Sequence, residues 1–102
     1  MGADGEAFAR YRRALAGEPL PAAIVDLDAF DANVERLLAP ARAAHKRLRI
    51  ATKSLRCPAL VARAAARADG VAGGLMTYDA RETAFLAGEG AALVGAVARD
   101  LL

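Results

Sequence analysis

Short apolar segments alternate with amphipathic segments along most of this chain, and this alternation constrains its fold more than any other feature. The pattern predicts strands over residues 22–26, 48–53 and 71–78, and residues 100–102 look like the start of a fourth. A helical pattern follows each of the three, with connections of only a few residues. Such an order predicts parallel βαβ units in an α/β fold. Either an open doubly wound sheet or a slice of a (β/α)₈ barrel satisfies it.

We interpret residues 1–20 as an N-terminal extension and residues 21–102 as the α/β domain. Apolar side chains recur at helical spacing over residues 6–16, which predicts one helix in the extension. Pro19 and Pro21 exclude helix after it, because proline lacks the N–H group and disfavours helical geometry in the residue before it. The chain therefore enters the domain in an extended conformation.

Individual residues predict where the helices of the domain begin and break. Asp28 has the position of an N-cap after the first strand, and Pro58 occupies the first position of the next helix. Pro40 falls inside the first of these helical patterns and predicts a kink or a break just before it. Asp79 and Glu82 have the spacing of a capping box, with aspartate in place of serine or threonine.

The charges of the chain are nearly balanced, which argues against partners that require a strong electrostatic field. Its 102 residues include 14 basic and 12 acidic ones, for a net charge of +2. We interpret the basic cluster at residues 45–49 as the positive end of a helix, because no aromatic residues are interleaved with it as in a nucleic-acid site. No apolar run approaches the roughly 20 residues of a membrane span. We expect a soluble, cytoplasmic protein with neither nucleic-acid nor membrane partners.

Cysteine and histidine are too few for a metal site. Cys57 is the only cysteine and His45 the only histidine, so neither an internal disulfide nor a C-x-x-C zinc site can form. Cys57 precedes the proline that opens a helix, and without a partner base we interpret it as structural. The sequence therefore predicts no bound metal.

The predicted strand over residues 48–53 ends on Lys53. A strand held in a packed sheet fixes the direction of its last side chain, as a covalent amine nucleophile requires. The alternative is a surface lysine whose stem lies along apolar neighbours while its amine stays in water. Thr52 and Ser54 flank Lys53 and point away from its face by alternation, so we expect packing roles for both.

Two further residues are candidates for the same site. Arg56, in the loop after the strand, has the two-pronged donor geometry that binds a phosphate or a carboxylate. Its alternative role is that of a solvated loop arginine. Tyr78 ends the next strand, at the edge where barrel active sites are built. Its alternative role is to pack its ring and hydrate its hydroxyl.

Three segments resemble the alanine racemase-like, fold type III pyridoxal-phosphate enzymes. Residues 21–34, with the run Asp-Leu-Asp, resemble the opening of that family, in which a proline and a short strand lead into the first barrel helix. Residues 49–54 resemble the first barrel strand, which carries the lysine bonded to the cofactor, and residues 74–78 resemble the second. The nearest branch contains D-threonine aldolase, D-serine dehydratase and related amino-acid deaminases and aldolases.

The resemblance implies a fold, a cofactor and a reaction class. The fold is the N-terminal portion of a pyridoxal-phosphate-binding (β/α)₈ TIM barrel, truncated after two to three βα units, since a full barrel takes about 250 residues. Lys53 is implied as the lysine that forms the Schiff base with pyridoxal 5′-phosphate. The activity implied for the parent enzyme, expected to be a homodimer, is that of an aldolase or deaminase on a small amino acid.

The chain departs from the family at three positions, which leaves other functions open. Ala51 and Leu55 stand where the aldolase proper carries histidines, and Cys57 stands where alanine racemases carry a phosphate-binding tyrosine. The alternatives are an amino-acid racemase, a regulatory barrel that binds pyridoxal phosphate without turnover, and an inactive truncated product.

Overall fold

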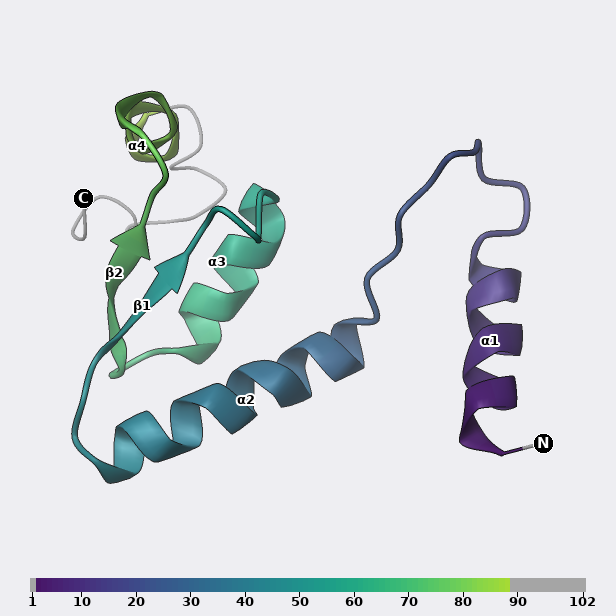
Figure 1. Ribbon diagram of the computed structural model, residues 1–102, viewed down its shortest axis with the longest axis horizontal. Helices are drawn as coiled ribbons and strands as arrows, with labels where there is room; N and C mark the ends of the chain where they lie inside the picture. The colour runs from purple at the N-terminus through teal and green to yellow at the C-terminus, as the bar shows by residue number, and fades with distance from the viewer. Residues whose placement is uncertain (1, 89–102) are drawn as a thin grey trace.

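The computed structural model describes residues 2–88, which form four helices and two parallel strands (Figure 1). In chain order these are α1 (Ala3–Ala14), α2 (Leu27–Ala43), β1 (Leu48–Ala51), α3 (Pro58–Arg67), β2 (Ala72–Met76) and α4 (Ala80–Ala87). The start of a further strand, expected at residues 100–102, lies outside the described residues. Within residues 2–88, no helix has the length and hydropathy of a membrane-spanning segment.

β1 and β2 pair in parallel and α3 connects them, which confirms the expected βαβ unit for this part of the chain. The register pairs Leu48 with Ala72 and Ile50 with Leu75, so β2 contains one extra residue between the two pairs. Gly74 lies in this bulge with φ 124°, a conformation that residues with a Cβ rarely adopt. Gly74 therefore allows β2 to accommodate the extra residue.

The buried side chains form two small clusters on either side of α3. One joins α3, β2 and α4, and its members are Val61, Leu75 and Leu86, with Ile50 and Leu55 packed against it. The other joins the C-terminal half of α2 to the end of α3 and the start of β2, and its members are Leu38, Ala41, Ala68 and Val71. Two of these seven residues, Ala41 and Ala68, are alanines, which bury little apolar area per residue.

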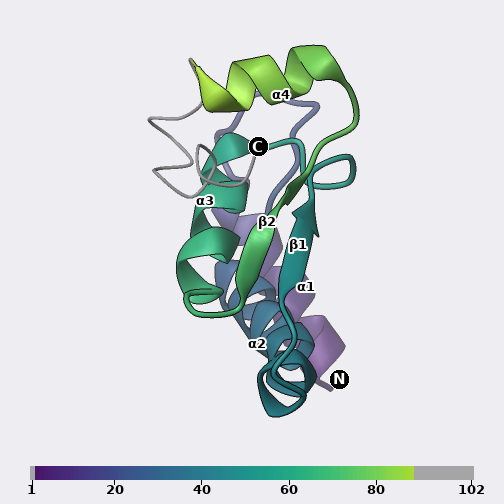
Figure 2. The same ribbon diagram turned by 90° about the vertical axis from the view of Figure 1, so that its left-hand side faces the viewer.

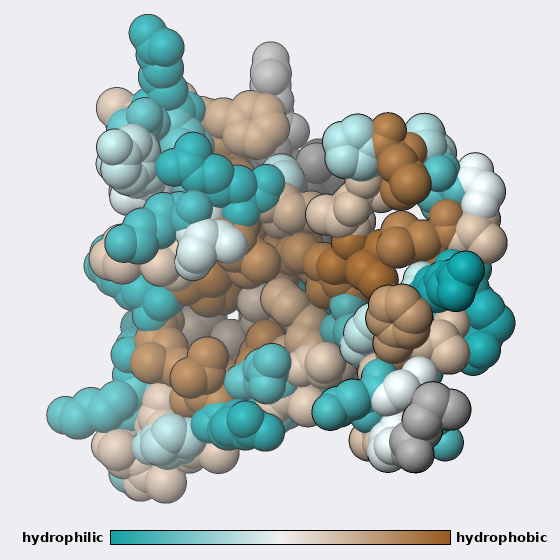
Figure 3. Space-filling model, turned by 45° about the vertical axis from the view of Figure 1, so that its right-hand side comes forward, coloured by the Kyte–Doolittle hydropathy of each residue, from teal (hydrophilic) through white to brown (hydrophobic). Residues whose placement is uncertain are grey.

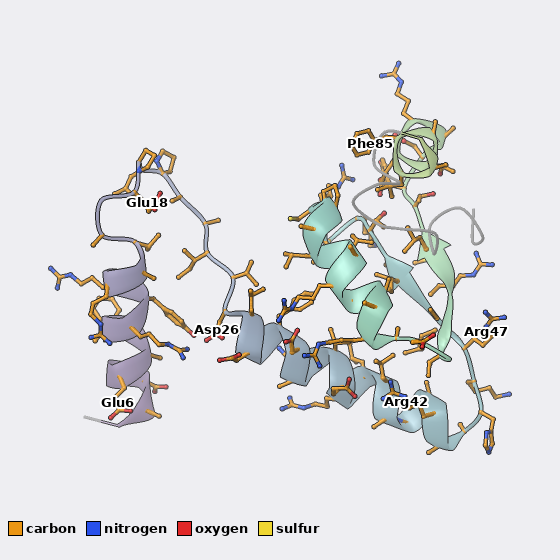
Figure 4. The ribbon with its side chains drawn as sticks, turned by 180° about the vertical axis from the view of Figure 1, so that it is seen from behind. Glu6, Glu18, Asp26, Arg42, Arg47 and Phe85 are labelled. Carbon is orange, nitrogen blue, oxygen red and sulfur yellow. The ribbon has the colours of Figure 1, made fainter. Side chains whose placement is uncertain are left out.

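α1 lies apart from this packed unit and buries none of its residues (Figure 1). Its side chains reach the rest of the chain at Asp26, which accepts a hydrogen bond of 2.8 Å from the hydroxyl of Tyr11 and pairs with Arg10. Figure 4 shows Asp26 at the start of α2, on the side that faces α1. The extension is thus helical, as expected, but one carboxylate provides its main attachment.

The segment over residues 22–26 is extended but is not a strand, so the first predicted strand is wrong. No strand among residues 2–88 pairs with it, and Ile24 and Val25 are 44% and 49% exposed. The N-cap of α2 is Asp26 rather than the predicted Asp28, because the Oδ1 atom of Asp26 accepts a hydrogen bond of 3.1 Å from the amide of Ala29. Helix α2 therefore begins two residues earlier than expected for an N-cap at Asp28.

Helix α2 continues through Pro40, so the predicted break is absent. Proline removes one hydrogen bond from a helix interior. Leu38 and Ala41, on either side of it, are buried against α3 and the start of β2, and this packing offsets the loss. The packing of α2 against α3 and β2 therefore outweighs the local tendency of Pro40 to end the helix.

The basic cluster at residues 45–49 does not form the end of a helix, contrary to the prediction. Helix α2 ends at Ala43, and Arg42 is the basic residue of its last turn. His45 adopts φ 53° in the turn that follows, and Arg47 donates a hydrogen bond of 2.8 Å to the carbonyl of Ala72. These residues thus form the turn into β1, with one of them tied to β2.

Candidate functional site

The carboxyl ends of β1 and β2 meet at the same edge of the sheet, below the first turn of α4. Figure 2 shows both arrowheads pointing toward this helix. Ligands of parallel α/β folds bind at this edge, because the loops that leave it can present side chains from several strands. The turn over residues 52–55 and the loop over residues 77–79 leave it here.

Lys53 lies in the turn after β1 and not in the strand itself, which corrects the predicted strand over residues 48–53. β1 ends at Ala51, and the amide of Thr52 makes a further bond to β2, 3.1 Å from the carbonyl of Met76. The amide of Leu55 then bonds the carbonyl of Thr52 at 3.1 Å and closes a turn around Lys53. The Lys53 side chain is exposed, and the geometry of the turn sets its direction.

Arg56 connects the other two predicted residues. Its Nε donates a hydrogen bond of 3.1 Å to the carbonyl of Lys53, and its guanidinium carbon lies 5.3 Å from the ring centroid of Tyr78. An exposed cation–π pair contributes only about 0.5 to 1 kcal/mol, so a bound anion can displace Tyr78 from Arg56 at little cost. The hydrogen bonds within residues 2–88 use only the Nε of Arg56, which leaves its two terminal nitrogens for a ligand.

Tyr78 follows β2, which ends at Met76, two residues earlier than predicted. Its side chain is 69% exposed, and its ring is covered on one side by the Arg56 guanidinium. The predicted site residues, separated by up to 25 positions, therefore meet at one edge of the sheet. The alternative role of Tyr78, to pack its ring and hydrate its hydroxyl, is met only in the contact between its ring and the Arg56 guanidinium.

The flanking residues differ from each other, contrary to the expectation of packing roles for both. Thr52 is 2% exposed, whereas Ser54 is exposed. The Thr52 hydroxyl donates a hydrogen bond to the Oε1 atom of Glu82 and lies 3.4 Å from the carbonyl of Met76. Ser54 faces outward because the turn has already ended the strand alternation.

Glu82 is the residue of this site that sequence reasoning missed, since its spacing from Asp79 marked it only as part of a cap. Asp79 caps α4 as predicted, accepting a 2.8 Å bond from the amide of Glu82. The Oε2 atom of Glu82 accepts a 3.3 Å bond from the amide of Tyr78, one residue before the cap. The capping spacing was the one signal for it, but its contact with Thr52 depends on the tertiary fold.

A cavity of about 200 Å³ lies between the first turns of α3 and α4. Val61 and Leu86 give it an apolar floor, and Arg56, Asp79 and Glu82 give it polar walls. Cys57, exposed at the N-cap of α3, also lines it. Neither Lys53 nor Tyr78 is among its lining residues, so Arg56 is the predicted site residue that links this cavity to the outer edge.

The three predicted side chains bring different chemical groups to this edge. Lys53 offers a primary amine, Arg56 a fork of donors suited to phosphate, and Tyr78 a ring and a hydroxyl. Within the described part of the chain, no cluster of three histidine, cysteine or acidic side chains is able to hold a metal ion.

Two carboxylates that join helices to other segments have lowered pKa values. The hydrogen bonds from Arg63 lower the pKa of Asp31, and the positive charges of Arg63 and Arg67 add to this effect. The hydrogen bond from Tyr11 lowers the pKa of Asp26, as does the amide of Ala29. These two carboxylates are structural, since each joins one helix to another segment.

No family model, no curated protein and no solved structure matches this chain. The candidate function therefore depends on the residues at the strand ends and on the geometry that brings them together.

Proposed function

We propose that this chain is the N-terminal part of a pyridoxal-phosphate-dependent enzyme that acts on small amino acids as an aldolase or deaminase. Lys53 is the lysine that bonds the cofactor. The observation that carries the proposal is the meeting of Lys53, Arg56 and Tyr78 at the carboxyl edge of β1 and β2.

Each residue has a separate task in this proposal. Lys53 presents its amine from a tight turn at the sheet edge, in water, where a ligand can approach it. Arg56 binds the phosphate with its two terminal nitrogens, while its Nε stays on the Lys53 carbonyl and so ties the anion site to the amine. Tyr78 offers its ring face to hold the cofactor at the edge. Pyridoxal phosphate, when bound, supplies an electron sink for the negative charge that develops at the amino acid's α-carbon.

The same proposal assigns the fold to the first βα units of a (β/α)₈ TIM barrel, with residues 1–20 as an extension. β1 pairs only with β2 within residues 2–88, so its other edge is open to a further strand. Beside it, α2, β1 and α3 enclose a hollow of about 330 Å³ lined mostly by apolar side chains such as Val34, Leu37 and Ile50. Additional barrel structure or the second subunit of a homodimer would bury this surface. The lone cysteine, Cys57, suits the reducing cytoplasm in which we place the enzyme.

A regulatory protein that binds pyridoxal phosphate without turnover is the second candidate. One observation favours it: Lys53 is not among the residues that line the 200 Å³ cavity, so this cavity does not hold a substrate against the amine. The two functions are separated by incubating the cofactor-loaded chain with a panel of D- and L-amino acids. Loss of substrate indicates the enzyme, and an unchanged panel indicates the regulatory protein.

Reductive labelling tests the role of Lys53. Treating the chain with pyridoxal phosphate and borohydride joins the lysine nitrogen to the aldehyde carbon, with the aldehyde oxygen leaving as water and hydride coming from borohydride. We expect peptide mapping to find much more label on Lys53 than on Lys46, an exposed lysine in the turn before β1. The variant Lys53→Arg should lose it. Equal labelling of both lysines, or labelling of neither, would contradict the proposal.

A further inference from the structure

Glu82 joins the ends of both strands at the candidate site. Its Oε1 atom accepts a hydrogen bond from the hydroxyl of Thr52, the residue directly before Lys53. Its Oε2 atom accepts a bond of 3.3 Å from the amide of Tyr78. One carboxylate of α4 is therefore bonded to the chain next to Lys53 and to the backbone of Tyr78 itself.

We call the two hydrogen bonds of the Glu82 carboxylate, to Thr52 and to the Tyr78 amide, the Glu82 link. At its Thr52 end, this link holds the turn that carries Lys53. Thr52 is one of the most deeply buried side chains of the molecule, with 2% of its surface exposed. Its amide bonds the carbonyl of Met76 at 3.1 Å, and its carbonyl receives the amide of Leu55 at the same distance. A shift of Thr52 would therefore move the turn, and with it the backbone from which the Lys53 side chain extends.

The α4 side of the link is held in place independently of Thr52. The amide of Glu82 bonds the Oδ1 atom of Asp79 at 2.8 Å, and the hydroxyl of Thr83 bonds the Asp79 carbonyl at 2.9 Å. Leu86, one turn further along α4, is buried in the cluster with Val61. The carboxylate of Glu82 thus projects from a helix turn whose position is set by its cap and by the core.

We propose that Glu82 is a positioning residue for Lys53 and Tyr78, an inference that rests on the proposed function. By bonding Thr52 and the Tyr78 amide at once, it sets the spacing between the turn after β1 and the loop after β2. Covalent bonding of an amine to a held aldehyde is sensitive to displacements of about 1 Å, so a lost link should reduce the reactivity of Lys53 without removing any group that touches the cofactor.

Three variants separate positioning from simple capping of α4. Glu82→Ala removes both hydrogen bonds, whereas Glu82→Gln has an oxygen and an amide group that can bond the Tyr78 amide and the Thr52 hydroxyl. Thr52→Val preserves the buried shape and removes only the hydroxyl, so it tests the link even if Glu82→Ala fails to fold. Glu35→Ala is the matched control, because Glu35 is an acidic residue of α2 that pairs with Arg42 and Arg67, remote from the strand ends.

The first readout is the ratio of label on Lys53 to label on Lys46 after reduction with borohydride in the presence of pyridoxal phosphate. Lys46 is exposed in the same molecule, so it corrects for protein amount and reagent strength. We expect the ratio to fall about tenfold in Glu82→Ala and in Thr52→Val, and to stay near the wild-type value in Glu82→Gln and Glu35→Ala. The second readout is amide hydrogen exchange of the chain without cofactor, which should accelerate over residues 52–56 and at Tyr78 in the first two variants.

The outcomes separate this inference from the proposed function. Equal labelling of Lys53 and Lys46 in the wild-type chain would overturn both. A wild-type chain that labels Lys53 selectively, with folded Glu82→Ala and Thr52→Val chains that do the same, would overturn the positioning role alone. A Glu82→Gln chain that labels as poorly as Glu82→Ala would overturn it as well, because the hydrogen bonds would then not be the cause.

Discussion

Helices α1 and α3 contrast in how they are held in the molecule. Helix α1 has regular hydrogen bonding and charges of the favourable sign at both ends, yet it buries no residue and Phe8 remains 67% exposed. Helix α3 is shorter but buries Val61, Ala64 and Ala65 between its neighbours. The difference shows that helix signals in a sequence predict that a helix forms, while the apolar residues facing a sheet decide whether it becomes part of a core.

Truncating one side chain in each helix tests this contrast, and we expect it to give the largest difference in the free energy of unfolding. Val61→Ala removes two methyl groups from a side chain that is 1% exposed, and we expect it to lower the free energy of unfolding by about 2 kcal/mol. Phe8→Ala removes a larger but exposed side chain and should change it by less than about 0.5 kcal/mol. Urea denaturation followed by circular dichroism measures both. A larger effect at Phe8 would mean that α1 packs against the core.

Acid should weaken the packed region through the carboxylate that joins α2 to α3. Arg63 donates two hydrogen bonds of 2.7 Å to Asp31, and Arg67 donates a third. They lower the pKa of Asp31, so its contribution to stability is present above the unfolded-state pKa of about 4 and is lost as the pH falls through the folded-state value.

The variant Asp31→Asn tests this contribution to stability, because asparagine has no carboxylate to titrate. We expect the wild-type chain to lose more stability than this variant when denaturation is repeated at pH values from 6 down to 2. Asp69→Asn is the control, because Asp69 is exposed and its side chain makes none of these bonds. Parallel pH profiles for the wild type and Asp31→Asn would contradict the role given to Arg63 and Arg67.

The smallest expected effect is at the attachment of α1. Tyr11→Phe removes the hydroxyl that donates a 2.8 Å bond to Asp26 and leaves the ring in place. Amide exchange in α1 should accelerate, while the unfolding of the β1–α3–β2–α4 region should stay within about 0.5 kcal/mol of the wild type. Arg12→Ala, a change elsewhere on α1, is the control. A cooperative loss of stability in the packed region would show that the two regions are coupled.

Several local features of the fold followed from residues whose effect needs no distant partner. Pro58 opens α3 because its fixed φ suits a first helical position, and Asp79 caps α4 through a carboxylate three residues from the amide it binds. The parallel pairing of β1 and β2 also followed, since a helix between two short strands permits little else.

The errors occurred where distant contacts outweighed local preference. Residues 22–26 have strand composition but pair with no strand among residues 2–88, and a short segment without a neighbouring strand cannot form a sheet. Pro40 predicts a kink or a break, and the break is absent because α2 continues through Pro40 with Leu38 and Ala41 buried on either side of it. Lys53 was correctly placed at the sheet edge, but a turn closed by Thr52 and Leu55 sets its direction instead of the strand.

The sequence by itself determined that this chain alternates strands and helices, where two of its helices begin, and which amine, guanidinium and phenol lie near strand ends. These properties depend on hydrogen bonds and backbone preferences within a few residues. Only the tertiary structure decided that Arg56 stacks on Tyr78, that Glu82 reaches Thr52, and that α1 lies outside the core. Such contacts join positions 22 to 30 residues apart, and they form only after β1 and β2 have paired and brought their ends together.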